Sequence, residues 1–202
     1  MVTSAAAMAA DDAFVRLRVP LFESLMDSFN DERRHVILDL GPARAGTIDL
    51  LSRFRCRLDI LDLPQALAEL KALEEPVAIE KALNRLLPPA GKDRVDLVCC
   101  WNLLNYLDPV VVAALMRLLT PRLAPQARVH ALIEYSATHM PASPGRMAPE
   151  DAATLIIEPA SDASIKTPRH SRAALEKLMP GFQPERTMLL GNGMQEHLFR
   201  RH

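Results

Sequence analysis

The chain has 202 residues, 49% of them hydrophobic, and 24 lysines and arginines balance 25 aspartates and glutamates to a formal net charge of −1. This length suits one domain with a sizeable core, and the charge balance gives no strong nucleic-acid signal, because nucleic-acid-binding proteins usually carry excess positive charge. Three cysteines exclude a framework of paired disulfides. The longest strictly apolar run, Val110–Met116, is far shorter than the about 20 residues that span a bilayer. Because Met1–Asp12 also lacks the basic start of a secretory signal, the sequence predicts a soluble, cytoplasmic protein.

Residues 1–30 are predicted to form an N-terminal helical extension that precedes the main domain. Apolar residues at helical spacing lie within Asp12–Phe29, and Pro20 is expected to kink, split or restart that helix. The main domain is then expected over residues 31–202.

Short apolar runs and amphipathic runs alternate through this domain, which indicates strands alternating with helices. In chain order, the expected elements are a strand His35–Gly41, a helix Ile48–Phe54 capped by Thr47, a strand Cys56–Leu63, helices Pro64–Leu73 and Ile79–Leu87, a strand Val95–Trp101, a helix Asp108–Leu119, a strand Arg128–Tyr135, a helix Ser171–Met179, and strands Gln183–Leu190 and Met194–Arg200. The turn Gly191-Asn192-Gly193 predicts that the last two strands form an antiparallel hairpin. The pattern predicts a Rossmann-like, doubly wound α/β fold with a mostly parallel sheet and right-handed crossovers.

The residues 137–168, rich in proline, serine and alanine, interrupt this alternation and predict a long irregular excursion. Excursions of this length within compact domains usually act as functional lids. We therefore expect Tyr135–Lys166 to form a lid over the carboxyl ends of the strands, where ligands bind in sheets of this kind.

The first strand ends in the turn Asp39-Leu40-Gly41-Pro42-Ala43-Arg44-Ala45-Gly46-Thr47. A phosphate-binding P-loop is excluded because Thr47 stands where that motif requires a lysine. A dinucleotide site fits poorly, because Ala43 replaces the second glycine of Gly-x-Gly-x-x-Gly, which lets the backbone approach a pyrophosphate. Neither of these two phosphate-binding motifs accounts for the turn.

Three features together resemble the class I S-adenosylmethionine-dependent methyltransferases. Asp39 and Gly41 match the start of that family's acidic, glycine-rich first motif. Asp62 follows Asp39 by 23 residues (62 − 39), where the family's ribose-binding acid usually falls, and Asp96–Leu107 is similar to its fourth-strand segment. The closing hairpin also fits the family's antiparallel final strand. The resemblance covers about residues 35–202 and implies a methyltransferase-like fold with S-adenosylmethionine as cofactor.

The resemblance further implies which residues line the cofactor site at the strand ends. They are Asp39, Gly41, Pro42, Ala43, Gly46, Asp62, Trp101 and Asn102. Asn105, Tyr106 and Glu134 are further candidates at the same mouth. No catalytic residue is identified, since the sulfonium of the cofactor is already activated and methyl transfer relies largely on positioning. No metal site is expected, because the histidines lack metal-ligand spacing.

Two functions follow from this reading. The first is a divergent methyltransferase that acts on an unidentified acceptor, with a small molecule favoured. The second is a non-catalytic pseudoenzyme that serves as a binding or assembly partner, either of another protein or as a homodimer. Ala43 and Ala45 at two glycine positions of the turn, and the lack of an evident third strand between Leu73 and Val95, motivate the second. It predicts that side chains such as Arg44 block the mouth of the first strand.

Overall fold

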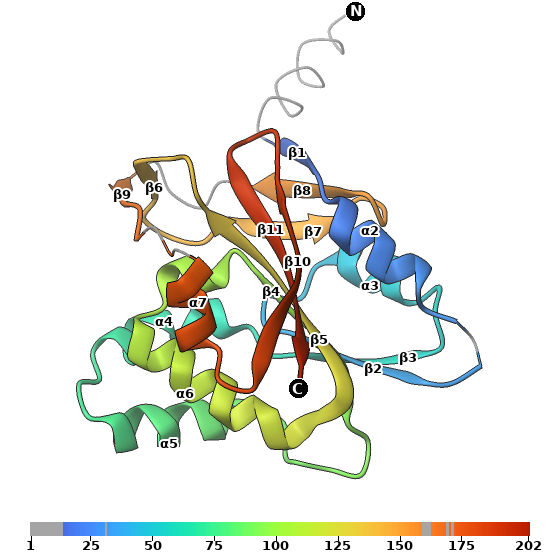
Figure 1. Ribbon diagram of the computed structural model, residues 1–202, viewed down its shortest axis with the longest axis horizontal. Helices are drawn as coiled ribbons and strands as arrows, with labels where there is room; N and C mark the ends of the chain where they lie inside the picture. The colour runs from blue at the N-terminus through green and yellow to red at the C-terminus, as the bar shows by residue number, and fades with distance from the viewer. Residues whose placement is uncertain (1–13, 31, 159–162, 169, 171) are drawn as a thin grey trace, which may run out of the picture.

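The computed structural model describes residues 14–30, 32–158, 163–168, 170 and 172–202. Within these residues the largest sheet has six strands in the order β10-β11-β5-β4-β2-β3 (Figure 1). The strands are β2 (His35–Asp39), β3 (Cys56–Ile60), β4 (Val95–Trp101), β5 (Leu123–Glu134), β10 (Phe182–Leu189) and β11 (Met194–Arg201). Four of them, β2 to β5, are parallel, and β11 runs antiparallel between β5 and β10. The predicted α/β class and closing hairpin are confirmed.

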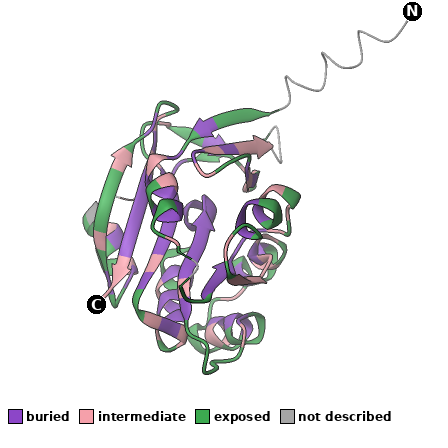
Figure 2. Cartoon of the chain, turned by 90° about the vertical axis from the view of Figure 1, so that its right-hand side faces the viewer, coloured by how far each residue is buried: buried purple, intermediate pink, exposed green. Residues whose placement is uncertain are grey.

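Helices cover both faces of this sheet. α2 (Pro20–Asp27) and α3 (Ala45–Leu51) pack on one face, while α4 (Leu63–Lys71), α5 (Pro76–Leu86), α6 (Pro109–Leu119) and α7 (Arg172–Leu178) pack on the other. The central strands between these two layers are buried along most of their length (Figure 2). The chain passes from β2 through α3 to β3, then returns past β2 to β4. Right-handed crossovers place the returning helices on the opposite face, so the strand order reverses between β2 and β4.

The chain between β3 and β4 forms helices α4 and α5, and all of its residues are described. It contains no strand, as the sequence indicates. Strand β3 is therefore an edge strand of the sheet, and every residue of Cys56–Ile60 is half-buried.

The N-terminal segment differs from the expected helix in its first half. Residues Val15–Arg18 form strand β1, which pairs antiparallel with β8 (Thr154–Glu158), and the helix α2 begins only at Pro20. Pro20 cannot donate a backbone hydrogen bond, which suits the first turn of a helix and prevents continuation from a preceding one. The expectations for Met1–Asp12 lie outside the described residues, and the division of the chain at residue 30 stays a prediction.

The expected irregular excursion is also wrong in its described part. It contains β6 (His139–Pro141), β7 (Arg146–Pro149), β8 and β9 (Ser164–Lys166). β1, β8 and β7 form a small antiparallel sheet, and β6 pairs with β9. The strands are short, and β6 and β7 contain prolines, so their local sequence carries little strand signal. Pairing with β1, more than a hundred residues earlier in the chain, stabilises β8 and through it β7, while β6 and β9 pair with each other.

The first turn of α3 also differs from the prediction. The helix begins at Ala45 after the extended residue Arg44, and no side chain caps it. Thr47, the expected cap, lies inside the helix, and its buried hydroxyl has no hydrogen-bond partner in the described part of the chain.

Among the described residues, no helix combines the length and the hydropathy that crossing a lipid bilayer requires.

Candidate cofactor crevice and neighbouring cavity

The carboxyl ends of β2, β3 and β4 meet at one edge of the sheet, at the reversal of strand order. Backbone hydrogen bonds join them: the Leu61 N–H donates to the Asp39 carbonyl at 2.8 Å, and the Asp62 N–H donates to the Gly41 carbonyl at 3.1 Å. Trp101 follows from the end of β4 on the other side of β2. The structure therefore brings together the main residues singled out from the sequence.

Asp39 is buried, at 1% exposure, and its carboxylate is used within the protein. Its Oδ1 accepts a hydrogen bond from the Gly41 backbone N–H at 2.8 Å and another from the Trp101 indole N–H at 2.6 Å. Its Oδ2 has no partner in the described part of the chain. Burial raises the pKa of Asp39 to about 6; these two hydrogen bonds oppose the rise, and the charge of Asp62 adds to it. Asp39 thus holds the indole against the turn.

Trp101 occupies the space above that turn. Its backbone has φ of 48°, a left-handed conformation that is uncommon for an aromatic residue, and this bend directs the side chain back over Gly41. A Cβ at Gly41 would lie 3.0 Å from the indole Cδ1, so the two residues are already in contact. The indole packs against the rings of Phe22 and His130, at centroid distances of 5.5 and 5.9 Å, and is 4% exposed.

The small sheet of β1, β8 and β7 closes the turn from outside. Arg44 forms an ion pair with Glu158 of β8, and a Cβ at Gly46 would overlap the carbonyl oxygen of Pro149 in β7. We call the space bounded by Gly41, Trp101 and Met147 the crevice; its cavity is about 10 Å³. That volume is at the lower limit for a single water molecule.

The remaining predicted residues lie around the crevice without completing a site. Pro42 is half-buried, Ala43 is exposed and Asn102 is buried. Asp62 is half-buried with φ of 46°, and its carboxylate accepts a hydrogen bond from the Gln65 side-chain amide at 2.7 Å. Aspartate tolerates this left-handed conformation better than most residues because its short polar side chain bonds locally.

Asn105 proves to be a structural anchor. Its side-chain amide donates to the carbonyls of Asn102 at 2.8 Å and Leu132 at 2.9 Å, and accepts from the backbone N–H of Glu134 at 2.9 Å. These bonds tie the 3-10 helix η2 (Leu103–Tyr106) to β5. Burial, together with the nearby charge of Glu134, raises the pKa of Tyr106 to about 12.

Glu196 was missed by sequence reasoning although it is fully buried. Its two carboxylate oxygens accept hydrogen bonds from the backbone N–H groups of Leu21 at 2.9 Å and Phe22 at 2.8 Å, at the start of α2. Nε2 of His130 lies 2.9 Å from the same carboxylate. The signal in the sequence was weak, because β11 mixes apolar residues with glutamine, histidine and arginines, so an acid in it is not marked as buried.

Changing Gly46 to alanine tests the closure of the turn. The added methyl group would overlap the Pro149 backbone, so we expect Gly46→Ala to lower the free energy of unfolding by roughly 1–3 kcal/mol. This holds although alanine is the better helix former by about 1 kcal/mol. Urea unfolding measures the change. Gly91→Ala is the matched control, because a Cβ there has no heavy atom closer than 3.9 Å, and a comparable loss in both variants would contradict the closure.

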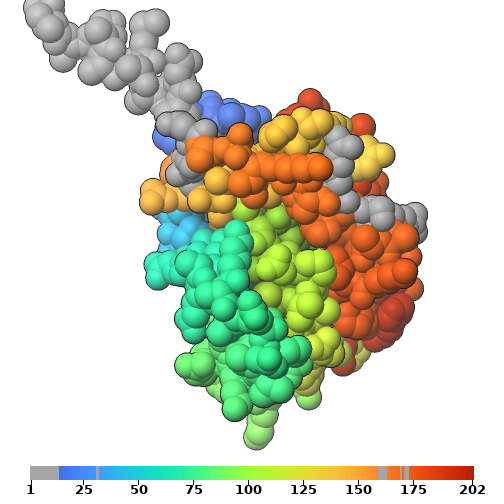
Figure 3. Space-filling model, turned by 90° about the vertical axis from the view of Figure 1, so that its left-hand side faces the viewer, coloured from blue at the N-terminus to red at the C-terminus, as the bar shows by residue number. Residues whose placement is uncertain are grey.

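A second cavity, of about 510 Å³, lies on the other side of η2, and we call it the outer cavity. It is bounded by η2, the start of α6, strands β6 and β9, and helix α7, and it shares no lining residue with the crevice. Figure 3 shows the face on which α4, the start of α6 and α7 lie side by side. Its size is typical of sites for small organic ligands.

Neither models of protein families nor curated protein sequences match the chain. Solved structures do. The Burkholderia thailandensis 1,6-didemethyltoxoflavin-N1-methyltransferase, solved with bound 1,6-didemethyltoxoflavin and S-adenosylhomocysteine, superposes with a TM-score of 0.52 at 16% identity, over 90% of this chain and 76% of that one. The pyocyanin biosynthetic protein PhzM gives 0.51 at 16% identity, over 97% of this chain and 56% of that one. The mitomycin 7-O-methyltransferase MmcR gives 0.50 at 16% identity, over 90% and 53%.

The chain has a divergent class I methyltransferase-like fold. Within that fold, the residues present do not fit S-adenosylmethionine in the crevice. The indole of Trp101 lies where a ligand would approach Gly41, β7 covers Gly46, and the space left is about 10 Å³. Such a volume is far below the several hundred Å³ that a drug-sized ligand requires. Of the described residues, no three histidines, cysteines or acids gather closely enough to hold a metal ion.

Proposed function

We propose that the protein is a non-catalytic protein with the methyltransferase-like fold, which binds a small molecule without S-adenosylmethionine. The observation that carries this proposal is the position of Trp101, whose indole lies over Gly41, is hydrogen-bonded to Asp39 and leaves a crevice of only about 10 Å³. For this function the sequence led us to expect blockage by side chains such as Arg44, but Arg44 pairs with Glu158, and the support for the proposal comes from Trp101 and β7 instead.

The energetic argument concerns displacement of the indole. Any cofactor in the crevice must move Trp101 out of its contacts with Phe22 and His130 and break its hydrogen bond to Asp39. Vacating a buried tryptophan position typically costs about 3–5 kcal/mol. A cost of that size weakens the apparent affinity for the cofactor by roughly a hundredfold or more.

A small-molecule ligand is favoured over a protein partner by the outer cavity. It has the volume of a ligand site and opens at the carboxyl edge of the sheet, where ligands bind in α/β folds. Two of the proteins of similar fold are described as methyltransferases of small molecules, 1,6-didemethyltoxoflavin and mitomycin. We extend to this chain only the binding of a small molecule.

Calorimetry with S-adenosylhomocysteine tests the proposal. We expect no heat of binding to the wild-type protein at millimolar ligand, and no change in the fluorescence of its only tryptophan. The Trp101→Gly variant should bind measurably, because glycine adopts the left-handed φ of this position without strain and leaves the crevice open.

Binding of S-adenosylhomocysteine to the wild type, with a change in Trp101 fluorescence, would contradict the proposal. If neither protein binds, the non-catalytic proposal stands, but the indole is not the reason. Circular dichroism of the variant verifies that it remains folded.

The second candidate is a divergent methyltransferase that transfers a methyl group from S-adenosylmethionine to a small-molecule acceptor. It is favoured by the convergence of Asp39 and Asp62 at the turn, which is the arrangement that the resemblance implies for the cofactor's site. It requires Trp101 to leave the crevice when the cofactor binds. Wild-type binding in the same titration would favour this function.

A further inference from the structure

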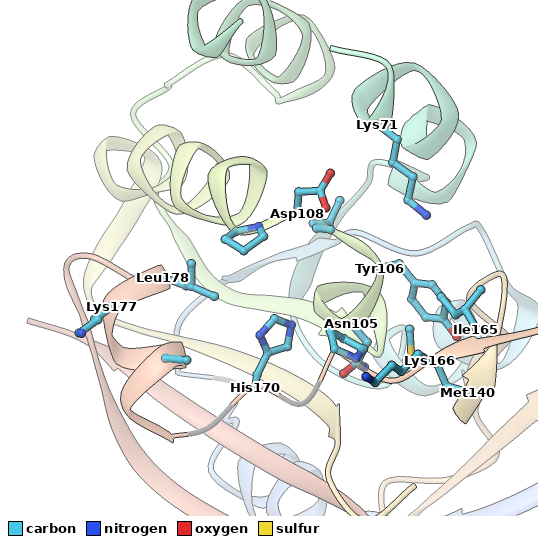
Figure 4. Close-up of a pocket in the computed structure, with 14 residues that line it drawn as sticks. Lys71, Asn105, Tyr106, Asp108, Met140, Ile165, Lys166, His170, Lys177 and Leu178 are labelled. Carbon is cyan, nitrogen blue, oxygen red and sulfur yellow. The ribbon is translucent and has the colours of Figure 1, made fainter. Parts of the chain in front are cut away.

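The outer cavity has walls of two kinds. Apolar side chains from separate elements form its interior surface, among them Tyr106, Met140, Ile165 and Leu178 (Figure 4). Charged side chains stand at its mouth. An occupant is thus expected to combine an apolar body with a charged group.

His170 lines this cavity, but its free nitrogen is not on the cavity surface. Burial lowers the pKa of the imidazole, against the effect of its hydrogen bond with the Leu104 backbone. Nε2 is shielded from solvent and has no partner in the described part of the chain. Because water can enter the cavity but cannot reach Nε2, an occupant could bond to this atom only by displacing the side chains that cover it. Recognition of an occupant therefore rests on the apolar surface and the charged side chains.

The charge at the mouth is predominantly positive. Among the described lining residues, Lys71 of α4, Lys166 of β9 and Lys177 of α7 are cations and Asp108 is the one carboxylate, although the amine of Lys177 points away from the cavity (Figure 4). The amine of Lys71 points from α4 toward Tyr106 and Ile165 (Figure 4). The whole chain has a net charge of −1, so this concentration of cations is local. A mouth lined by one sign of charge raises the local concentration of ligands of the opposite sign.

We propose that the outer cavity binds a small aromatic carboxylic acid. The carboxylate meets Lys71 and Lys166, and the ring packs on Tyr106 and Met140. A monoanion is favoured over a phosphate dianion because Asp108 repels additional negative charge and because the cations among the described lining residues are lysines, which do not bind phosphate in a bidentate manner. This assignment rests on the proposed small-molecule binding but not on the state of the crevice.

Calorimetry with matched probes tests this assignment. We expect phenylacetate to bind at least tenfold more tightly than phenylacetamide, which lacks the charge. The double variant Lys71→Ala/Lys166→Ala should lose at least tenfold in affinity for the acid. Lys81→Ala, an exposed lysine of α5 away from the cavity, is the control and should bind as the wild type does.

Absence of binding by the acid at millimolar concentration, equal binding of acid and amide, or undiminished binding by the lysine double variant would each overturn the proposal. Tighter binding of phenyl phosphate than of phenylacetate would overturn the choice of a carboxylate. None of these results depends on S-adenosylhomocysteine, so failure here is distinguishable from failure of the closed crevice.

Discussion

Replacing Glu196 by alanine is expected to lower the free energy of unfolding by about 3–5 kcal/mol, the cost of removing one partner from a buried charged network. The carboxylate is fully buried and accepts from two backbone N–H groups, of Leu21 and Phe22, as well as contacting His130. No other side chain caps α2. Its loss leaves the first-turn donors of that helix and one nitrogen of a buried imidazole without partners, away from water.

Urea unfolding of wild type and variant measures this effect. Glu185→Ala is the matched control, since Glu185 lies on the neighbouring strand β10 and forms a half-exposed ion pair with Arg128 at 2.9 Å. Such pairs contribute about 1 kcal/mol or less. A loss of under 1 kcal/mol in Glu196→Ala would show that water or rearranged side chains replace the carboxylate.

Strands and helices with strong local patterns were predictable from the sequence. The run Val95–Trp101, apolar except for Asp96, predicts β4 with the observed bounds, and Gly191-Asn192-Gly193 predicts the hairpin of β10 and β11. Strand β1 was missed although Val15, Leu17 and Val19 alternate with two arginines, which is the period of a strand. What could not be predicted is its pairing with β8. The register of that pair joins Leu17 to Leu155, a contact that no short window of sequence contains.

The candidate site, like the fold, was predictable from the sequence only in part. The spacing of Asp39 and Asp62 predicted that both acids lie at the carboxyl edge, because it places each at the end of a parallel strand. The closure of the crevice was not predictable, since it depends on the left-handed backbone of Trp101 and on ring contacts with Phe22 of α2 and His130 of β5. Those contacts depend on how three separate elements pack.

Closure also gives Asp39 and Trp101 a shared role that differs from cofactor binding. A carboxylate at a strand end costs free energy when buried, and here donors from Gly41 and Trp101, rather than a ligand, offset part of that cost. The raised pKa of Asp39 shows that part of the cost remains. The acid of the turn and the indole therefore stabilise each other inside the protein. Because of this internal hydrogen bond, the arrangement in which Trp101 covers Gly41 is favoured over one in which the indole has moved away and left the crevice empty.

Replacing Asp39 by asparagine is expected to raise the free energy of unfolding at pH 7.5 by roughly 1–3 kcal/mol. Asparagine keeps an oxygen that accepts from Gly41 and Trp101 but removes the buried charge. The rise of the pKa from 3.8 to about 6 sets the upper limit, about 3 kcal/mol, because each unit corresponds to 1.36 kcal/mol. The amide's N–H group, facing a position without a partner, reduces the gain.

The same carboxyl predicts the sign of a pH dependence. Between about pH 4 and 6 the folded protein keeps a proton on Asp39 that the unfolded chain releases, so the stabilisation is complete below pH 4 and is lost as the pH rises to 6. Urea unfolding at intervals from pH 4 to 7.5, followed by fluorescence of the only tryptophan, measures it. The difference in free energy of unfolding between wild type and Asp39→Asn isolates Asp39 from other groups with raised pKa, such as Glu134.

We expect a small difference in free energy of unfolding at pH 4 that grows to its full value by pH 6.5. A difference that stays constant over this range would mean that Asp39 is solvated, and therefore that the crevice is open to water.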